Sequence, residues 1–274
     1  ASDVYKRQAL ERFYNSSIRL RPLAFLLLGL SVCGIFMAAA GRRRPLWTVT
    51  MVAGGLAGVI YIGVALAIRA YVGGHLPFAD GHETMLSLAL IACAGAVFAR
   101  HDLLLRPGLL MVGALATLVA VMGEKSPQIV SLMPVLASPW LSVHVMLVIL
   151  SYAAFSLMAI LSAVALLGRH RNLRHRCAAL CRAILLPGVF LLGAGIMAGA
   201  VWANQSWGRY WGWDPKETCA LVTLLVYALP LHRASFPVFA RDGALCVYLL
   251  LAIGAVLFTY FGANYLMPGL HSYA

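Results

Sequence analysis

The chain has 274 residues, of which 62% are hydrophobic and only 11% are charged, and its mean hydropathy is +0.87. About 25% of the residues of an ordinary soluble domain are charged, so this chain has too few polar residues to cover the surface of a soluble globular enzyme. Intrinsic disorder is excluded as well, because it requires low hydrophobicity. The composition therefore predicts an all-α, polytopic transmembrane helical bundle.

The apolar stretches follow one another along nearly the whole chain. The first residues, Ala1–Gln8, are out of keeping with the rest of the chain, so we treat them as a candidate non-native segment and give them no weight. A spanning helix needs about 20 apolar residues. We therefore predict about eight spanning helices, some of them short: Leu23–Ala40, Leu46–Ala67, Met85–Phe98, Pro107–Met122, Leu141–Leu167, Ile184–Trp202, Glu217–Leu231 and Ala244–Phe261.

The formal net charge of +12 belongs to short basic clusters between these stretches, which favours a membrane-orientation signal over nucleic-acid binding. Alternate loops carry twelve and four basic residues, so the first set is predicted to be cytoplasmic, with both chain termini outside. The basic N-terminal region argues against this placement of the first helix. The cytoplasmic set is Arg42, Arg43, Arg44, Arg100, Arg106, Arg169, Arg171, Arg174, Arg176, Arg182, Arg233 and Arg241, and the outer set is Arg69, Lys125, Arg209 and Lys216.

Four of the six tryptophans fall within Trp202–Trp213, on the outer side, in the sequence W-A-N-Q-S-W-G-R-Y-W-G-W-D-P-K-E-T. Gly208 and Gly212 interrupt this segment, and Asp214 with Glu217 predicts a capping box for the next helix. A belt of aromatic residues at the membrane interface explains one or two tryptophans at a helix end. Four in one irregular loop favour a flat platform for a large planar ligand.

Two histidines are predicted on the same side as this segment: His144 at the start of the fifth span, and His271 beyond the last one. A lone histidine is more often structural, but two histidines flanking an aromatic platform suggest a sandwiched metal macrocycle. Neutral imidazole is a usual axial ligand of haem iron. Arg209 and Lys216 are suitable partners for the carboxylates of such a ring.

The other histidines are less informative. His232 ends the seventh span on the inner side, where it is either a ligand or an interfacial residue beside Arg233. His75 and His82 lie in a structured outer loop, where plain loop residues are favoured over secondary ligands.

The segment W-G-R-Y-W-G-W-D-P-K-E-T, running into A-L-V-T-L-L-V-Y-A-L-P-L-H-R, resembles the tryptophan-rich WWD signature of haem-handling proteins. Its W-D-P-K-E-T ending is similar to the CcsA/ResC type of cytochrome c biogenesis (System II). Three further stretches agree: G-H-L-P-F-A-D-G-H-E-T-M, H-V-M-L-V-I-L-S-Y-A-A-F and G-L-H-S-Y. The resemblance covers about Tyr71–Ala274. It divides the chain into N-terminal transmembrane helices (9–70) and a cytochrome c assembly (WWD) haem-handling domain (71–274).

The resemblance implies a membrane subunit of the cytochrome c synthetase complex. Such a subunit works with a CcsB/ResB-type partner, exports haem b as its substrate and presents it for thioether attachment to the CxxCH thiols of apocytochrome c. Thiol-reducing proteins and membrane lipid are further expected partners, and nucleic acid is not. The chain is then a component of a holocytochrome c synthase (haem lyase), with no catalytic residue of its own. The expected location is the bacterial plasma membrane with the WWD loop outside, and a thylakoid location stays open.

Residue by residue, the resemblance implies that His144 and His271 are the external axial ligands of haem iron. His232 matches the transmembrane haem histidine of the family, whose second ligand belongs to the partner protein. The remaining predicted haem-binding residues are Trp202, Trp207, Trp211, Trp213, Asp214, Arg209 and Lys216. Cys219 stands where the family usually has tryptophan, and His82 replaces a usual tyrosine.

Three alternatives compete with this interpretation. A CcmC-type haem chaperone or a CcmF-type lyase subunit belongs to the same superfamily, but W-D-P-K-E-T and eight spans favour the CcsA type. A b-type membrane cytochrome needs paired histidines inside spanning helices, whereas every histidine here is predicted at a helix end or in a loop. A solute transporter usually has polar residues or broken helices at the midplane, and the predicted spans have almost no charge.

Overall fold

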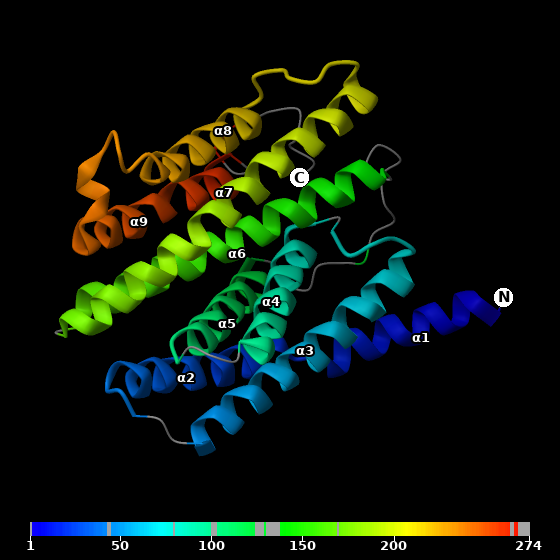
Figure 1. Cartoon of the computed structure of the whole chain (residues 1–274). Coiled ribbons are helices and arrows are strands. Elements are labelled where there is room, and N and C mark those ends of the chain that lie inside the picture. Colours follow the sequence, from blue (N-terminus) through cyan, green and yellow to red (C-terminus); the bar gives the residue numbers. More distant parts are fainter. Residues whose placement is uncertain are drawn as a thin grey trace. The chain divides into compact units, whose positions relative to one another are not determined.

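The structure is a computed structural model that describes residues 2–42, 45–78, 80–99, 103–123, 129, 138–168, 170–263 and 266–267. These residues form helices and connecting segments, with no strand among them (Figure 1). The chain divides into two compact units, Ala1–Ala137 and Ser138–Ala274. The prediction of an all-α helical bundle is confirmed.

The first unit contains α1 (Ser2–Ser17), α2 (Leu20–Ala39), α3 (Pro45–Gly73), α4 (Gly81–Phe98) and α5 (Leu105–Gly123). The second contains α6 (Pro139–Leu167), α7 (Arg171–Trp207), α8 (Pro215–Ala228), η2 (Leu229–Leu231), η3 (Pro237–Ala240), α9 (Asp242–Leu257) and the π-helical η4 (Phe258–Gly262).

Seven of the described helices are long and apolar enough to cross a membrane: α2, α3, α4, α5, α6, α7 and α9 with η4. The chain is therefore a multi-pass membrane protein. The remaining predicted span, Glu217–Leu231, corresponds to α8 followed by the short η2, and α8 itself has only 14 residues.

In the first unit, α4 packs on α3 and α5, and α5 also packs on α2. Small residues allow this close approach: a Cβ atom on Gly58 of α3 would lie only 2.7 Å from the Cys93 sulfur of α4. Helix α3 continues past the predicted end at Ala67. Arg69, which we counted among the outer-loop charges, therefore lies inside a helix and is 1% exposed.

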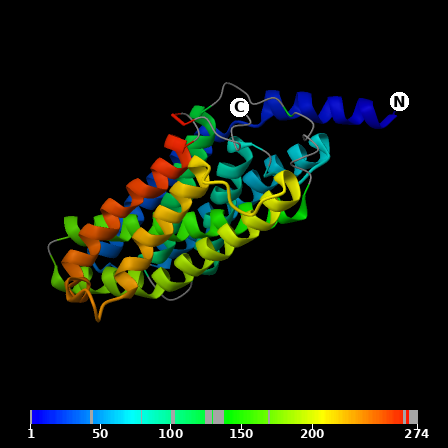
Figure 2. The same cartoon turned by 90° about the horizontal axis from the view of Figure 1, so that it is seen from above.

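The second unit is built on an antiparallel hairpin of α6 and α7, against which α8 and α9 pack. Figures 1 and 2 both show α8 and α9, in orange and red, running side by side. Helix α7 has 37 residues and is about 55 Å long, whereas the hydrocarbon core of a bilayer is about 30 Å thick. Its basic N-terminal turns therefore extend beyond the apolar part.

Candidate functional site

The tryptophan-rich segment is helical in its first half and irregular only in its second. Trp202 and Trp207 belong to the last turns of α7 rather than to a loop. The helix ends at Gly208, whose φ of +72° is left-handed and whose N–H donates to the Asn204 carbonyl. Residues 209–214, which we call the tryptophan loop, then lead into α8. The irregular loop is therefore shorter than we predicted, because the glycine stops the helix only after the second tryptophan.

The tryptophan rings do not form the single flat platform that we predicted. The rings of Trp202 and Trp207 have centroids 4.9 Å apart at 66°, and those of Trp211 and Trp213 are 5.7 Å apart at 89°. Trp202 is buried, while Trp213 is 71% exposed with a φ of +56°. A bulky residue rarely adopts a left-handed φ, so the backbone is strained where it presents this ring outward.

A capping box holds the loop to α8, as the sequence predicts. The buried Asp214 carboxylate accepts a hydrogen bond from the Lys216 N–H at 3.0 Å. Glu217 accepts in turn from the N–H groups of Asp214, at 3.2 Å, and Gly212, at 2.8 Å. Glu217 thus fixes two points of the tryptophan loop, and Asp214 has a structural function beside its predicted place in the haem site.

Two cations flank the loop. Arg209 is exposed, and its guanidinium lies over the backbone of Gly212, where a Cβ atom would be 3.0 Å from its Nε. Lys216 is half-buried, and burial lowers the pKa of its ammonium group, partly opposed by the nearby Asp214 carboxylate. A cation held in a partly dry position gains from the arrival of an anionic group.

His144 lies near the start of α6 and, because α6 and α7 are antiparallel, against the C-terminal half of α7. Its Nδ1 is 2.7 Å from the carbonyl oxygen of Gly195. A carbonyl can only accept, so Nδ1 carries the proton and Nε2 carries the lone pair. Gly199 lies against the ring, where a Cβ atom would be 2.6 Å from Nδ1.

The structure brings His144 to the part of the site that holds the first tryptophans. Gly195, Gly199 and Trp202 are spaced four and three residues apart, so they share one face of α7. Sequence reasoning missed the two glycines as part of this site. The signal was present as Gly195-Ile-Met-Ala-Gly199, a small-xxx-small pattern that permits close helix approach in membranes.

His232 lies at the other end of α8, about 21 Å along the helix axis from the tryptophan loop. Its side chain is exposed, and its Nδ1 donates to the Ala228 carbonyl at 3.1 Å, which again places the lone pair on Nε2. His271 lies outside the described residues. No group of three histidine, cysteine or acidic residues within the described ranges is arranged to hold a metal ion by itself.

His82, in contrast, has both ring nitrogens in contact with the first unit. Its Nδ1 donates to the Ala120 carbonyl at 2.9 Å, and its Nε2 accepts from the Tyr14 hydroxyl at 3.3 Å. It lies in the first turn of α4 rather than in a loop and is 8% exposed. His75 donates from Nδ1 to the adjacent Leu76 carbonyl at 2.8 Å. These contacts favour structural roles for both.

Sequence reasoning also missed a buried ionic cluster in the first unit. The Arg69 guanidinium donates to Glu83 at 2.9 Å and to Asp80 at 2.8 Å. Asp80 is the N-cap of α4 and accepts from the Glu83 N–H at 2.7 Å. Asp80 and Glu83 stand inside the F-A-D-G-H-E-T-M stretch, but nothing in their spacing connects them to an arginine on the preceding helix.

Comparison with known proteins identifies the family. The family model of the cytochrome C assembly protein matches residues 17–271. Protein NrfI of Wolinella succinogenes is 37% identical, over 77% of this chain but only 24% of its own length. The cytochrome c biogenesis protein CcsA of Chlamydomonas reinhardtii is 35% identical, over 76% of this chain and 64% of its own.

The chain thus spans about a quarter of the first of these relatives and slightly under two thirds of the second. It spans 93% of a third, the cytochrome c biogenesis protein CcsA of Parasynechococcus marenigrum, which is 30% identical over 91% of this chain. These matches show that the chain belongs to the cytochrome c assembly protein family, within which it is of the CcsA type.

Proposed function

We propose that this chain is the haem-handling subunit of a membrane cytochrome c synthetase complex. It binds haem b as substrate, exports it, and presents it externally for thioether attachment to the CxxCH thiols of apocytochrome c. The observation that carries this proposal is the position of His144 beside the tryptophan-rich end of α7, in a defined tautomer. Family membership supports the biogenesis role.

The surroundings of His144 have the form expected of an iron ligand. A metal-ligating histidine usually donates its other ring N–H to a carbonyl or carboxylate, which fixes its tautomer and orientation. The Gly195 carbonyl supplies this contact, and Gly199 allows the ring to lie directly on α7. His144 is therefore prepared to offer Nε2 to iron, with His271 as the opposite ligand by its place in the G-L-H-S-Y motif.

The tryptophan loop and its two cations complete this external site. Trp207, Trp211 and Trp213 supply apolar ring surface, while Arg209 and Lys216 meet the two carboxylates of the haem edge. The Glu217 contacts hold the loop in the conformation that contains the left-handed φ of Trp213. The function of these residues is to exclude water and to orient the haem vinyl groups toward the incoming thiols.

His232 marks a second, inner site at the cytoplasmic end of α8. Its second ligand comes from a CcsB/ResB-type partner, so this chain alone holds only half of that site. The two sites lie at opposite ends of α8, and in the orientation with twelve cytoplasmic arginines His232 lies toward the cytoplasm and the tryptophan loop toward the outside. The location we propose is the bacterial plasma membrane, with the tryptophan loop on the periplasmic side.

The bond-forming step needs no nucleophile from this chain. Each CxxCH thiol adds across one vinyl group: sulfur bonds to one carbon, and a proton is taken up at the other. The thiols belong to the apocytochrome and must be reduced, which accounts for thiol-reducing partner proteins. This chain contributes proximity and orientation. The histidine of CxxCH then replaces one axial ligand, which releases the product.

Maturation of a reporter apocytochrome c by the complex tests this proposal. His144→Ala should lower covalent haem attachment at least about tenfold, since the loss of even an outer contact to a metal ligand costs 10–100-fold. His170→Ala is the matched control, because His170 is exposed and its side chain does not cap α7. Equal maturation by the two variants would reject His144 as a ligand.

The inner site has a separate readout. His232→Ala should lower the total haem that co-purifies with the complex, whereas His144→Ala should mainly change its absorption spectrum. Unchanged haem content in His232→Ala would reject the inner site and leave the external one intact.

A further inference from the structure

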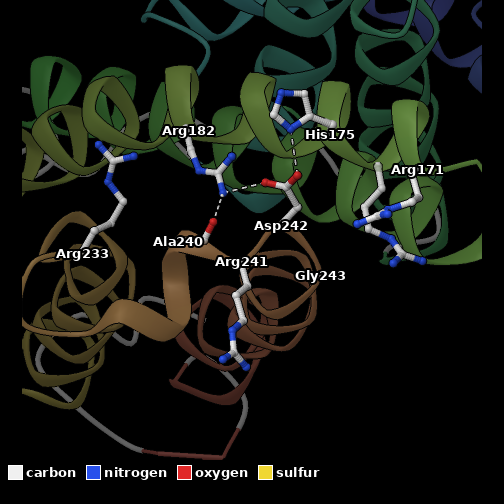
Figure 3. A pocket seen from close by; sticks show the side chains of 9 residues that line it. Arg171, His175, Arg182, Arg233, Ala240, Arg241, Asp242 and Gly243 are labelled. Atoms are coloured by element: carbon white, nitrogen blue, oxygen red, sulfur yellow. Dashed lines mark hydrogen bonds and ion pairs between the residues drawn. The ribbon is translucent and has the colours of Figure 1, made fainter.

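A basic cavity lies in the second unit where α7 and α9 begin, away from the tryptophan loop (Figure 3). Its volume is about 580 Å³, within the range of pockets that hold small ligands. Side chains of α7, of η3 and the residues around it, and of the first turn of α9 line it. Five of these are arginines: Arg171, Arg174, Arg182, Arg233 and Arg241.

Asp242 is the single acidic residue of the lining, and its carboxylate is already paired with two lining residues. Its two carboxylate oxygens accept from Arg182 at 2.8 Å and from His175 at 2.9 Å. Figure 3 shows Arg182 and His175 pointing toward this carboxylate, with Arg233 and Arg171 on either side. Among the described residues, no carboxylate forms an ion pair with the other four arginines. The cavity thus has a strong excess of positive charge, which attracts anions.

Membrane orientation alone does not require this arrangement. The orienting effect depends on how many basic residues a loop carries, and not on whether they line one cavity. Here side chains from the start of α7 and from the start of α9, far apart in the sequence, line the same space. They also lie at the level where the helices become apolar: Ile184 follows Arg182 closely, and Leu245 follows Asp242.

Exposed apolar side chains continue from the cavity along both helices. On α7, Leu186 and Phe190 follow Arg182 at four-residue intervals and are 62% and 72% exposed. On α9, Val247 and Leu251 follow Gly243 with the same spacing and are 47% and 73% exposed. Each row is exposed, and each continues along its helix from a residue that lines the basic cavity.

The lining selects the class of ligand. Apart from the arginines, Asp242 and His175, it contains only Ala240 and Gly243, so it offers no broad aromatic or aliphatic wall for a porphyrin or a nucleobase. Arginine forks match the oxygens of phosphate. Basic pockets between membrane helices on the cytoplasmic side are suited to anionic lipid head groups.

We propose that this cavity binds the phosphate head group of an anionic phospholipid, whose acyl chains lie along the exposed faces of α7 and α9. The lining includes none of the proposed haem-binding residues, although Arg233 directly follows His232 in the sequence. It depends on the placement of the chain in a membrane, and not on the proposed transport of haem.

Lipid retention by the purified full-length chain, measured by native mass spectrometry, tests the proposal. The probes are phosphatidylglycerol, zwitterionic phosphatidylcholine and inorganic phosphate. The pocket variant is Arg174→Gln/Arg233→Gln, and the matched control is Arg21→Gln/Arg42→Gln, which removes the same charge from exposed positions of the first unit. Wild type and control should retain phosphatidylglycerol in preference to phosphatidylcholine. The pocket variant should bind it roughly tenfold more weakly.

Equal retention of the two lipids, or equal losses in the pocket and control variants, would overturn the proposal. Displacement of the lipid by millimolar inorganic phosphate would assign the cavity to a soluble anion instead, and displacement by haemin would assign it to haem carboxylates. If the double variant does not keep its helical circular dichroism, Arg241→Gln alone should still weaken retention. No outcome depends on cytochrome c maturation, so a failure here is distinct from a failure of the haem proposal.

Discussion

The two units use arginine in opposite ways. In the first unit, Arg69 is 1% exposed and donates to both Glu83 and Asp80, so two carboxylates compensate its charge inside the protein. In the second unit, five arginines surround a cavity with one aspartate. The buried cluster compensates its arginine within the unit, while the open one has an excess of arginines and is the site that we propose for an anion. The local balance of charge, rather than position in the sequence, is therefore our ground for separating the structural arginine from the proposed binding arginines.

The histidines show the same contrast. Both His82 and His144 donate Nδ1–H to a backbone carbonyl. The Nε2 of His82 accepts from a tyrosine hydroxyl, and the residue is buried in its unit. His144 is half-buried, and its ring lies against Gly199, on the helix face that carries Trp202. The first arrangement holds the ring within one unit, and the second is the one that we propose for an iron ligand.

The largest expected effect is a loss of stability when the buried cluster around Arg69 is broken. Arg69→Met leaves the carboxylate of Glu83 buried without its cation, which costs about 3–5 kcal/mol of unfolding free energy. Thermal loss of helical circular dichroism in detergent measures this. Arg182→Gln is the comparison, because the pair of Arg182 with Asp242 is partly exposed and should contribute only about 0–1 kcal/mol. Similar losses in both variants would show that burial does not distinguish the two clusters.

A smaller and more specific effect is expected where His144 packs against Gly199 of α7. Gly199→Ala places a methyl group 2.6 Å from Nδ1 of His144 and must displace the ring, whereas Gly193→Ala meets only Leu224 Cδ1 at 3.8 Å. Covalent haem attachment to apocytochrome c should fall about tenfold in Gly199→Ala and stay unchanged in Gly193→Ala. Unchanged attachment in both variants would show that Gly199 does not position His144 for ligation.

The smallest effect concerns Lys216. Burial lowers the pKa of Lys216 in the folded protein, so the protonated form carries a stability penalty that is fully present below the folded pKa. As the pH rises from the pKa of Lys216 in the folded protein toward its ordinary pKa of 10.5, the folded protein loses this proton before the unfolded chain does. The unfolding free energy of the wild type should therefore rise between these two pH values. Thermal unfolding against pH should show that Lys216→Met removes this rise. Arg209→Met should keep it, because arginine does not titrate there.

Sequence pattern was enough for the fold class, most of the helices and the capping box, since these depend on composition and local spacing. Contacts between helices were less accessible. The flat tryptophan platform was wrong because Gly208 ends α7 only after Trp207, which leaves the rings edge-on to one another. Arg69 is buried because α3 continues for six residues beyond Ala67, where the apolar stretch in the sequence led us to end the predicted span. The contact of His144 with Gly199 depends on how α6 is aligned along α7, and no local sequence pattern specifies that alignment.

The most direct measurement is the absorption spectrum of the haem-loaded complex carrying His144→Gly, recorded with and without added imidazole. Removing the ring leaves space beside Gly195 and Gly199 in which free imidazole can take its place. We expect the variant to lose the six-coordinate haem spectrum and to regain it when imidazole is added, while His170→Gly keeps it throughout. A six-coordinate spectrum in His144→Gly without imidazole would contradict the assignment of His144 as an iron ligand.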